Sequence, residues 1–232
     1  MVHAETSTGV MNCASGIGQL VKDKETLYLL DTVTSLGGVE VNIDLWNVDA
    51  AYSGSQKCLS CPPGLAPVTF SEKAINAIRK RKNKVPNWYL DMEMILKYWE
   101  GKKRIYHHTA PINMLYALYQ ALIMINEEGL EKVFKRHKEN HKTLINELKL
   151  MGLNMVVEEK YRLPMLNAVY VPENHDEQGI RKELRNKHKI EIGGGLGPLA
   201  GKIFRIGLMG HTARIENVRR LLNALSSIIN EN

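Results

Sequence analysis

The sequence predicts an α/β fold, with a partial, mostly parallel sheet in its first half and a small α+β domain at its C-terminal end. Two short apolar runs near the N-terminus each end at a polar turn, which is typical of strands. Helical periodicity follows from residue 110, and strand-like and helix-like segments then alternate. The composition, 44% hydrophobic and 24% charged over 232 residues, is that of a globular domain.

In the first third, residues 26–30 form an apolar run that ends at Asp31, and residues 48–52 form another that ends at Ser53-Gly54-Ser55. Continuous apolar runs of this kind predict parallel strands that are buried on both faces. Open parallel sheets bind their ligands beyond the carboxyl ends of the strands. We therefore expect Asp31 and the segment through Lys57 to line one crevice.

From Ala110 onward, apolar residues recur every three or four positions, which predicts an amphipathic core helix. A second helix is expected over residues 130–150, where Gly152 supplies the stop and many Lys, His and Glu residues indicate a wet outer face. The domain boundary is expected inside these long helices, near residue 128. Residues 1–128 then form a partial large domain, and residues 129–232 form a small C-terminal α+β domain.

The C-terminal part predicts strands at residues 166–171, 190–192 and 202–208, a polar helix over 176–186 and a closing helix over 213–229. A glycine run at residues 193–197 has G-x-G spacing. Because Pro198 follows it instead of a helix, a dinucleotide site is not expected. We expect a flexible loop there that covers a bound substrate.

The charge pattern bears on the possible partners. The net charge of +6 and the basic cluster at residues 79–84 invite a nucleic-acid interpretation. Because no aromatic residues interleave that cluster, we expect a solvated face and no nucleic-acid partner. No apolar run approaches the roughly 20 residues that a membrane span needs, and no basic and apolar leader opens the chain. Neither membrane insertion nor secretion is expected.

Cysteine and histidine give little reason to expect a metal site. The three cysteines are too few for a disulfide framework. Cys58 and Cys61 form a C-x-x-C, but no second pair completes a zinc site and two prolines follow, so we treat the motif as incidental. His107 and His108 are adjacent, and adjacent side chains diverge. We expect them to serve packing, and we expect no metal.

Two residues could carry a specific chemistry. Lys57 follows small, turn-forming residues at a strand end, where its amine could reach a cofactor aldehyde. Asp31 could supply the anion that a pyridine cofactor needs beside its ring nitrogen. Position alone leaves both interpretations open, because Lys57 could be an exposed loop lysine and Asp31 could cap its own turn.

Four motifs together carry a family resemblance. They are Asp31-Thr-Val-Thr-Ser-Leu-Gly-Gly, Ser53-Gly-Ser-Gln-Lys57, Tyr106-His-His-Thr109 and Phe204-Arg-Ile-Gly. In this order and over essentially the whole chain they resemble the class V aminotransferases, nearest the alanine–glyoxylate and serine–pyruvate group. The resemblance implies the C-terminal part of a fold type I transferase, with pyridoxal 5′-phosphate (PLP) as cofactor.

The resemblance also implies roles for individual residues around the cofactor. Lys57 would bind the cofactor as a Schiff base and later shuttle a proton as general base and acid. Asp31 would pair with the pyridine nitrogen, and Val33 would pack on one face of the ring. Gln56 and Thr6 correspond in place to residues that hydrogen-bond the cofactor.

Three further residues are assigned by the same resemblance. Tyr106 and Thr109 would reach across a homodimer interface to the phosphate of the partner's cofactor, so that the active sites are shared. Arg205 would grip the substrate carboxylate, which suits its bidentate geometry. Its apolar neighbours predict a largely buried strand, where an unpaired charge is costly, so an anionic partner is expected.

The expected activity is transfer of an amino group from alanine or serine to glyoxylate or another 2-oxo acid, by a ping-pong route. A 3-hydroxykynurenine transaminase is the runner-up. A desulfurase would want a mobile nucleophilic cysteine, and none lies at the expected place. Peroxisome or mitochondrion is implied by the family. Family members carry a large N-terminal portion that precedes residue 1 here, so a truncated chain that binds PLP weakly, or a non-catalytic binding protein, is a further alternative.

Overall fold

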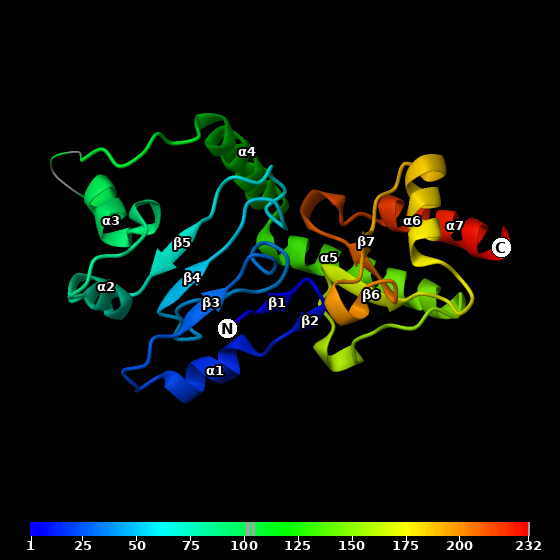
Figure 1. Cartoon of the computed structure of the whole chain (residues 1–232), viewed down its shortest axis with the longest axis horizontal. Coiled ribbons are helices and arrows are strands. Elements are labelled where there is room, and N and C mark those ends of the chain that lie inside the picture. The colour runs from blue at the N-terminus through cyan, green and yellow to red at the C-terminus, as the bar shows by residue number, and fades with distance from the viewer. Residues whose placement is uncertain (101–102, 104, 232) are drawn as a thin grey trace.

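The computed structural model describes residues 1–100, 103 and 105–231. It shows two lobes along the long axis of the molecule (Figure 1). One lobe holds the sheet of β3 (Leu29–Asp31), β4 (Ala50–Tyr52) and β5 (Val68–Phe70). The other holds the sheet of β6 (Leu166–Tyr170), β8 (Ile203–Gly207) and β7 (Gly193–Gly194). The predicted α/β fold is confirmed.

The first sheet contains the two strands that the sequence predicted. β3 and β4 pair in parallel, with Asp31 opposite Tyr52, while β5 pairs antiparallel with β4 and was not predicted. The prediction that these two strands are buried on both faces is wrong. Leu30 and Ala51 are buried, whereas Leu29 is 52% exposed and Tyr52 is 37% exposed. The reason is that α1 (Ala14–Val21) and the residues around it cover one face of these strands only.

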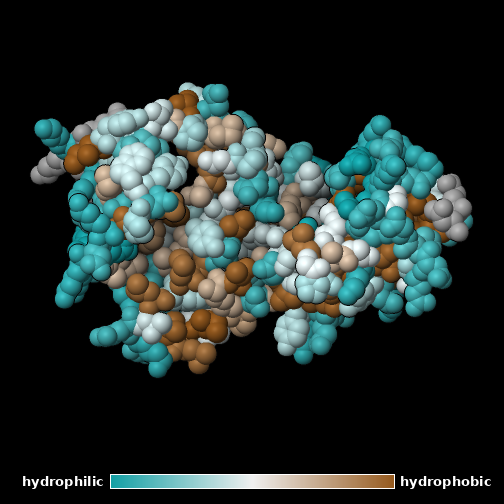
Figure 2. Space-filling model, in the orientation of Figure 1, coloured by the Kyte–Doolittle hydropathy of each residue, from teal (hydrophilic) through white to brown (hydrophobic). Residues whose placement is uncertain are grey.

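The elements around this sheet were not predicted, and the hairpin among them contacts both lobes. A short hairpin of β1 (Ala4–Glu5) and β2 (Val10–Met11) precedes α1. After β5 come α2 (Glu72–Arg79) and α3 (Met92–Glu100). Figure 2 shows hydrophobic side chains gathered on the face of the lobe around α1. Within α1 itself, Leu20 is 68% exposed.

The helix expected as a core helix is α4 (Ile112–Glu128), and that expectation is wrong. Among its described residues only Ala121 is buried. Its apolar side chains include Tyr116 and Tyr119, which are 71% and 65% exposed. The helix contacts α5 along only part of its surface, so most of the periodic apolar positions face outward.

The second lobe matches its predicted order of elements. Helix α5 (Leu130–Leu150) has the predicted bounds, and Gly129, with φ of +85°, separates it from α4. The antiparallel sheet β6-β8-β7 packs with α6 (Glu177–Glu183), a π-helical turn (Leu184–His188) and α7 (Ile215–Glu231). Its main hydrophobic cluster draws only on residues 144–228. The boundary near residue 128 stays a prediction that these features support.

Two expectations about the glycine-rich segment are corrected. No strand forms at residues 190–192 of the described chain, because the strand lies at Gly193–Gly194, opposite Arg205 and Phe204 of β8. Those two glycines are therefore part of the sheet rather than a flexible loop. A short helical turn (Gly197–Leu199) follows. No described helix of the chain has both the length and the apolar content for crossing a membrane.

Candidate functional site

Asp31 ends β3 with its carboxylate held from two sides. Oδ1 accepts the main-chain N–H of Val33 at 2.8 Å, and Oδ2 accepts the hydroxyl of Tyr52 at 2.7 Å. The first bond is the turn-capping interaction that the sequence allowed. A carboxylate has about four lone-pair sites, so these two bonds leave room for another donor. Capping and cofactor binding are therefore compatible roles for Asp31.

Lys57 lies half-buried in a loop that packs against the turn after β3. The Ser53 hydroxyl donates to the carbonyl oxygen of Thr32 at 3.1 Å. Directly after Lys57, the thiol of Cys58 donates to the carbonyl oxygen of Thr34 at 3.2 Å. These bonds hold the two segments side by side, as the positions of the motifs at adjacent strand ends led us to expect.

Gly54 lies between two side chains that are predicted to touch the cofactor. A Cβ atom at this position would lie 2.7 Å from Oε1 of Gln56 and 3.3 Å from Cγ1 of Val33. A side chain at position 54 would therefore displace them. An anchored carboxylate, an amine on the adjoining loop and an apolar side chain are what a pyridine aldehyde requires. Asp31, Lys57 and Val33 thus fit the expected cofactor.

Arg205 reaches from β8 to the hairpin turn that contains Thr6. Its Nη1 donates to the carbonyl oxygen of Thr6 at 3.1 Å, and its Nε donates to the carbonyl oxygen of Gly194 at 2.6 Å. Its neighbours Phe204 and Ile206 are buried as predicted, while Arg205 itself is half-buried. Within the described part of the chain Arg205 forms no ion pair. Two of its five N–H groups are used, so a carboxylate could bind the others.

Tyr106 and Thr109 lie at the surface and bond to each other, hydroxyl to hydroxyl, at 2.6 Å. Between them His107 is buried, stacks on Trp88 at 4.3 Å and bonds the carbonyl oxygen of Trp88 through Nε2 at 3.1 Å. The expected packing role of His107 is confirmed. The contact of Tyr106 and Thr109 with a second copy stays a prediction, and their exposure leaves them free to make it.

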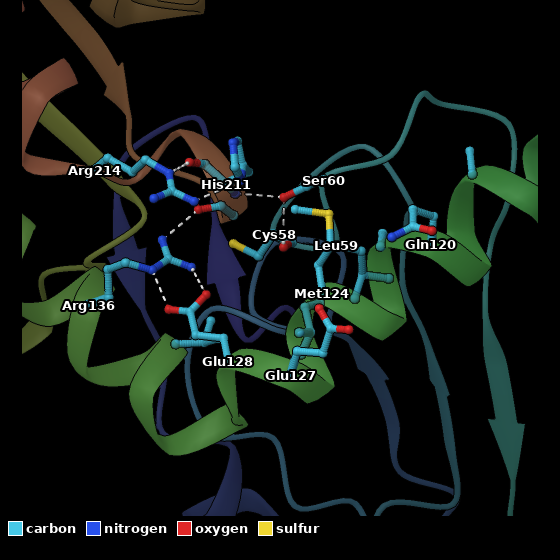
Figure 3. A pocket seen from close by; sticks show the side chains of 15 residues that line it. Cys58, Leu59, Ser60, Gln120, Met124, Glu127, Glu128, Arg136, His211 and Arg214 are labelled. Atoms are coloured by element: carbon cyan, nitrogen blue, oxygen red, sulfur yellow. Dashed lines mark hydrogen bonds and ion pairs between the residues drawn. The ribbon is translucent and has the colours of Figure 1, made fainter.

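A joint connects the Lys57 loop to the second lobe. The main-chain N–H of His211 donates to the hydroxyl of Ser60 at 2.8 Å, which Figure 3 shows. The main-chain N–H of Gly210 donates to Nε2 of His137 at 2.9 Å, and Arg136 donates to the Gly210 carbonyl oxygen at 2.8 Å. The loop after Lys57, helix α5 and the end of β8 therefore meet at Gly210.

The polar face of α5 is not entirely the wet outer face that its composition indicated. His137, Asn140 and His141 are buried. Nδ1 of His141 bonds Oδ1 of Asn167 at 2.6 Å, and Asn140 donates to the carbonyl oxygen of Ala213 at 2.7 Å. Burial lowers the pKa of both His137 and His141. These side chains are buried because they form hydrogen bonds with Gly210, Ala213 and Asn167, which lie outside α5 in the second lobe.

A cavity of about 740 Å³ lies beside the joint, between α4, α5 and the loop after Lys57 (Figure 3). At its edge Arg136 pairs with Glu128 at 2.6 Å, and this bond lowers the pKa of Glu128. None of the predicted cofactor or substrate residues lines it. The lining residues are Cys58, Leu59, Ser60, Ala117, Gln120, Ala121, Met124, Ile125, Glu127, Glu128, Val133, Arg136, Gly210, His211 and Arg214.

The cysteines of the C-x-x-C are both buried and unpaired. Burial raises the pKa of Cys58 to about 12, so its thiol stays protonated and is a poor nucleophile. This argues against the desulfurase alternative for Cys58. Among the described residues, no cluster of three or more His, Cys, Asp and Glu side chains is arranged to hold a metal ion.

Comparisons with known proteins agree with this geometry. The profile of the family described as "Aminotransferase class-V" matches residues 1–221. The chain is 41% identical to alanine–glyoxylate aminotransferase of Oryctolagus cuniculus over 97% of its own length and 58% of that protein. It is 36% identical to (S)-ureidoglycine–glyoxylate transaminase of Bacillus subtilis over 99% of its length and 59% of that protein.

Solved structures give the same relationship. The crystal structure of alanine–glyoxylate aminotransferase from Nostoc sp. superposes with a TM-score of 0.94 at 50% identity, over 98% of this chain and 60% of that one. The chain thus spans a little under three fifths of the length of the curated relatives named above. The cofactor class expected from the sequence is confirmed, because class-V aminotransferases depend on PLP. The chain belongs to the class-V aminotransferase family, with the fold of the type I PLP enzymes.

Proposed function

We propose that this chain takes part in PLP-dependent transfer of an amino group from a small amino acid, alanine or serine, to glyoxylate, which yields glycine. The observation that carries the proposal is the packing of the Asp31 turn against the Lys57 loop, with the Asp31 carboxylate fixed by two hydrogen bonds. Relatives named as alanine–glyoxylate aminotransferases support the choice of substrates.

PLP, when bound, supplies a protonated pyridine ring that accepts electrons from the substrate α-carbon. Asp31 would bind the ring nitrogen and hold its proton. Lys57 would hold the aldehyde carbon through Nζ and, once released, would move the proton at the substrate α-carbon as general base and then general acid. Val33 would pack on the ring and Gln56 would hydrogen-bond the cofactor.

Arg205 binds the substrate carboxylate in this proposal. Its guanidinium is already oriented by the carbonyl oxygens of Thr6 and Gly194, so its remaining N–H groups point in a defined direction. Both the amino donor and the 2-oxo acceptor carry a carboxylate, so one arginine serves both half-reactions. Arg205→Lys should therefore raise KM for both substrates much more than it lowers kcat, because uniform binding is lost.

The remaining assignments concern a second copy and the cell. Tyr106 and Thr109 hold the cofactor phosphate of a partner chain in a homodimer, which their exposure and mutual hydrogen bond support. Thr6 contributes a cofactor contact from the hairpin turn. The proposed location is peroxisome or mitochondrion, on family resemblance alone.

A second amino donor is favoured by one observation. The relative from Bacillus subtilis is named (S)-ureidoglycine–glyoxylate transaminase and matches 99% of this chain. The acceptor, glyoxylate, is then the same, and the two proposals differ only in the donor. Rates with glyoxylate and, in turn, alanine, serine, (S)-ureidoglycine and 3-hydroxykynurenine decide between the donors, including the runner-up from the sequence.

The test of the proposed function uses Lys57→Ala. The unchanged protein should bind PLP with a visible absorption band and should convert glyoxylate to glycine. Lys57→Ala should lose the absorption band and should no longer be linked covalently to PLP by borohydride, which reduces a lysine Schiff base. Turnover should fall by orders of magnitude, because the lysine amine that binds the cofactor and carries the proton is gone. Lys138→Ala, which removes an exposed lysine from α5, is the control. Full turnover by Lys57→Ala contradicts the assignment, and absence of PLP binding by the unchanged chain supports the non-catalytic alternative.

A further inference from the structure

A tyrosine on β4 lies beside the carboxylate that is proposed to hold the cofactor ring. Tyr52 is opposite Asp31 in the parallel pair of β3 and β4, so the two side chains project from the same face of the sheet. The Tyr52 hydroxyl donates to Oδ2 of Asp31 at 2.7 Å. From the sequence, Tyr52 was predicted only as the last residue of a strand. It has no part in the cofactor or substrate contacts proposed above.

The two bonds to Asp31 come from different parts of the chain. The N–H of Val33 belongs to the same turn and fixes Oδ1, whereas the hydroxyl of Tyr52 belongs to the neighbouring strand and fixes Oδ2. With one bond, a carboxylate can still rotate about its Cβ–Cγ bond. With both, its plane is fixed, and each oxygen keeps a lone pair for a further donor.

Tyr52 is also a donor whose protonation state is stable. The hydrogen bond to Asp31, and then partial burial, raise the pKa of the Tyr52 phenol above its ordinary value. The phenol therefore remains protonated at physiological pH and keeps donating. Tyr52 is 37% exposed and is not a member of the buried hydrophobic cluster beneath these strands, and its hydroxyl is bonded to Asp31.

We propose that Tyr52 is a positioning residue, whose hydroxyl fixes the orientation of the Asp31 carboxylate so that a free lone pair of that carboxylate faces the pyridine nitrogen of PLP. The inference rests on the proposed function, because it takes Asp31 as the partner of that nitrogen. Tyr52 acts through Asp31 and does not itself touch the reacting atoms.

The first experiment needs no cofactor. Phenolate absorbance is titrated in the full chain without PLP, for the unchanged protein, Tyr52→Phe and Asp31→Asn. The tyrosine assigned to Tyr52 by difference should titrate at lower pH in Asp31→Asn, because its charged acceptor is gone. An unchanged titration means that the hydrogen bond does not form in solution, and it overturns the inference.

The second experiment measures PLP held by the same proteins. Loss of one hydrogen bond to a charged group predicts that Tyr52→Phe has a dissociation constant for PLP about tenfold higher. Its visible circular dichroism, which reports how the bound ring is oriented, should fall in amplitude. Tyr170→Phe is the matched control, because Tyr170 also ends a strand, is 45% exposed and has no hydroxyl bond among the contacts of the described residues. It should leave both quantities unchanged.

The outcomes separate the inference from the proposed function. If Asp31→Asn weakens PLP binding and Tyr52→Phe behaves as Tyr170→Phe does, Asp31 keeps its role and the positioning role of Tyr52 is overturned. If the first experiment shows the hydrogen bond but Asp31→Asn binds PLP normally, the role of Asp31 in the proposed function fails, and the inference fails with it. The inference is supported if Tyr52→Phe binds PLP more weakly and loses visible circular dichroism, while Tyr170→Phe leaves both quantities unchanged.

Discussion

Gly210 offers the sharpest test of how the two lobes are joined. Its φ is +56°, a left-handed conformation that costs a residue with a Cβ about 1 to 2 kcal/mol. A Cβ would also collide with Oγ of Ser60 and would lie 2.7 Å from the main-chain oxygen of Cys58. The serine could turn away, but the carbonyl belongs to a loop held by its own hydrogen bonds. Overpacking of this kind costs about 1 to 3 kcal/mol more.

Gly210→Ala should therefore lower the free energy of unfolding by about 2 to 5 kcal/mol, the sum of the conformational and steric contributions. Gly201→Ala separates the two. Gly201 has a φ of +72°, but nothing lies within 4 Å of its Cβ position, so only the conformational cost of about 1 to 2 kcal/mol applies. Urea unfolding followed by circular dichroism, with both variants and the unchanged chain, measures the difference.

The result that would refute the reasoning is equal destabilisation by the two substitutions. It would mean that the Ser60 and Cys58 loop does not press on Gly210 in solution, and that the hydrogen bond from His211 to Ser60 is not a fixed joint. A further check is the double variant Gly210→Ala with Ser60→Ala, which removes Oγ and keeps a Cβ at residue 60. It should recover part of the lost stability, because one of the two colliding groups is removed while the Cys58 carbonyl remains.

Two further predictions concern titration and reactivity. Burial lowers the pKa of His3, His137 and His141, so the folded state binds fewer protons at these residues than the unfolded state does. Their contribution to stability should therefore be fully present above the usual histidine pKa of about 6.5 and should be lost as the pH drops below it. The urea midpoint should accordingly decrease between about pH 7.5 and 5. A constant midpoint would contradict the burial of these rings. Hydrogen bonds from Ser15 and Gly16 lower the pKa of the exposed Cys13, whereas burial raises that of Cys58 to about 12, so a thiol reagent should modify Cys13 first and reach Cys58 only on unfolding. Mass spectrometry of partly modified protein checks the order, and early labelling of Cys58 would be the contrary result.

The sequence was sufficient to predict elements whose signals are local. Helix α5 was predicted to start near Leu130 and to end at Leu150, where Gly152 supplies the stop, and the observed helix has these bounds. The parallel pairing of β3 and β4 follows from apolar runs that end in polar turns. The turn-capping bond of Val33 to Asp31 is likewise local, since donor and acceptor are two positions apart in the sequence.

The errors have a common physical cause, which is that burial depends on partners far along the chain. Apolar periodicity in α4 indicated a core helix, yet its apolar side chains face outward because little of the described chain packs on them. The polar side chains of α5 indicated solvent, yet His137 and His141 are buried because Gly210 and Asn167 supply their hydrogen-bond partners. A periodicity identifies a face, but it does not say what meets that face.

The same distinction applies to the site. Asp31 and Lys57 could be recognised because each stands in a motif, whereas Tyr52 could not, because its importance depends on the register of β4 against β3. Register is a property of the pair of strands and is not written in either one. A shift by one residue would turn the phenol to the opposite face and leave Oδ2 of Asp31 without its donor. The position of the carboxylate that is proposed to pair with the cofactor nitrogen thus depends on strand pairing as much as on the motif. For this reason Tyr52→Phe tests both the register of the strands and the proposed role of Asp31.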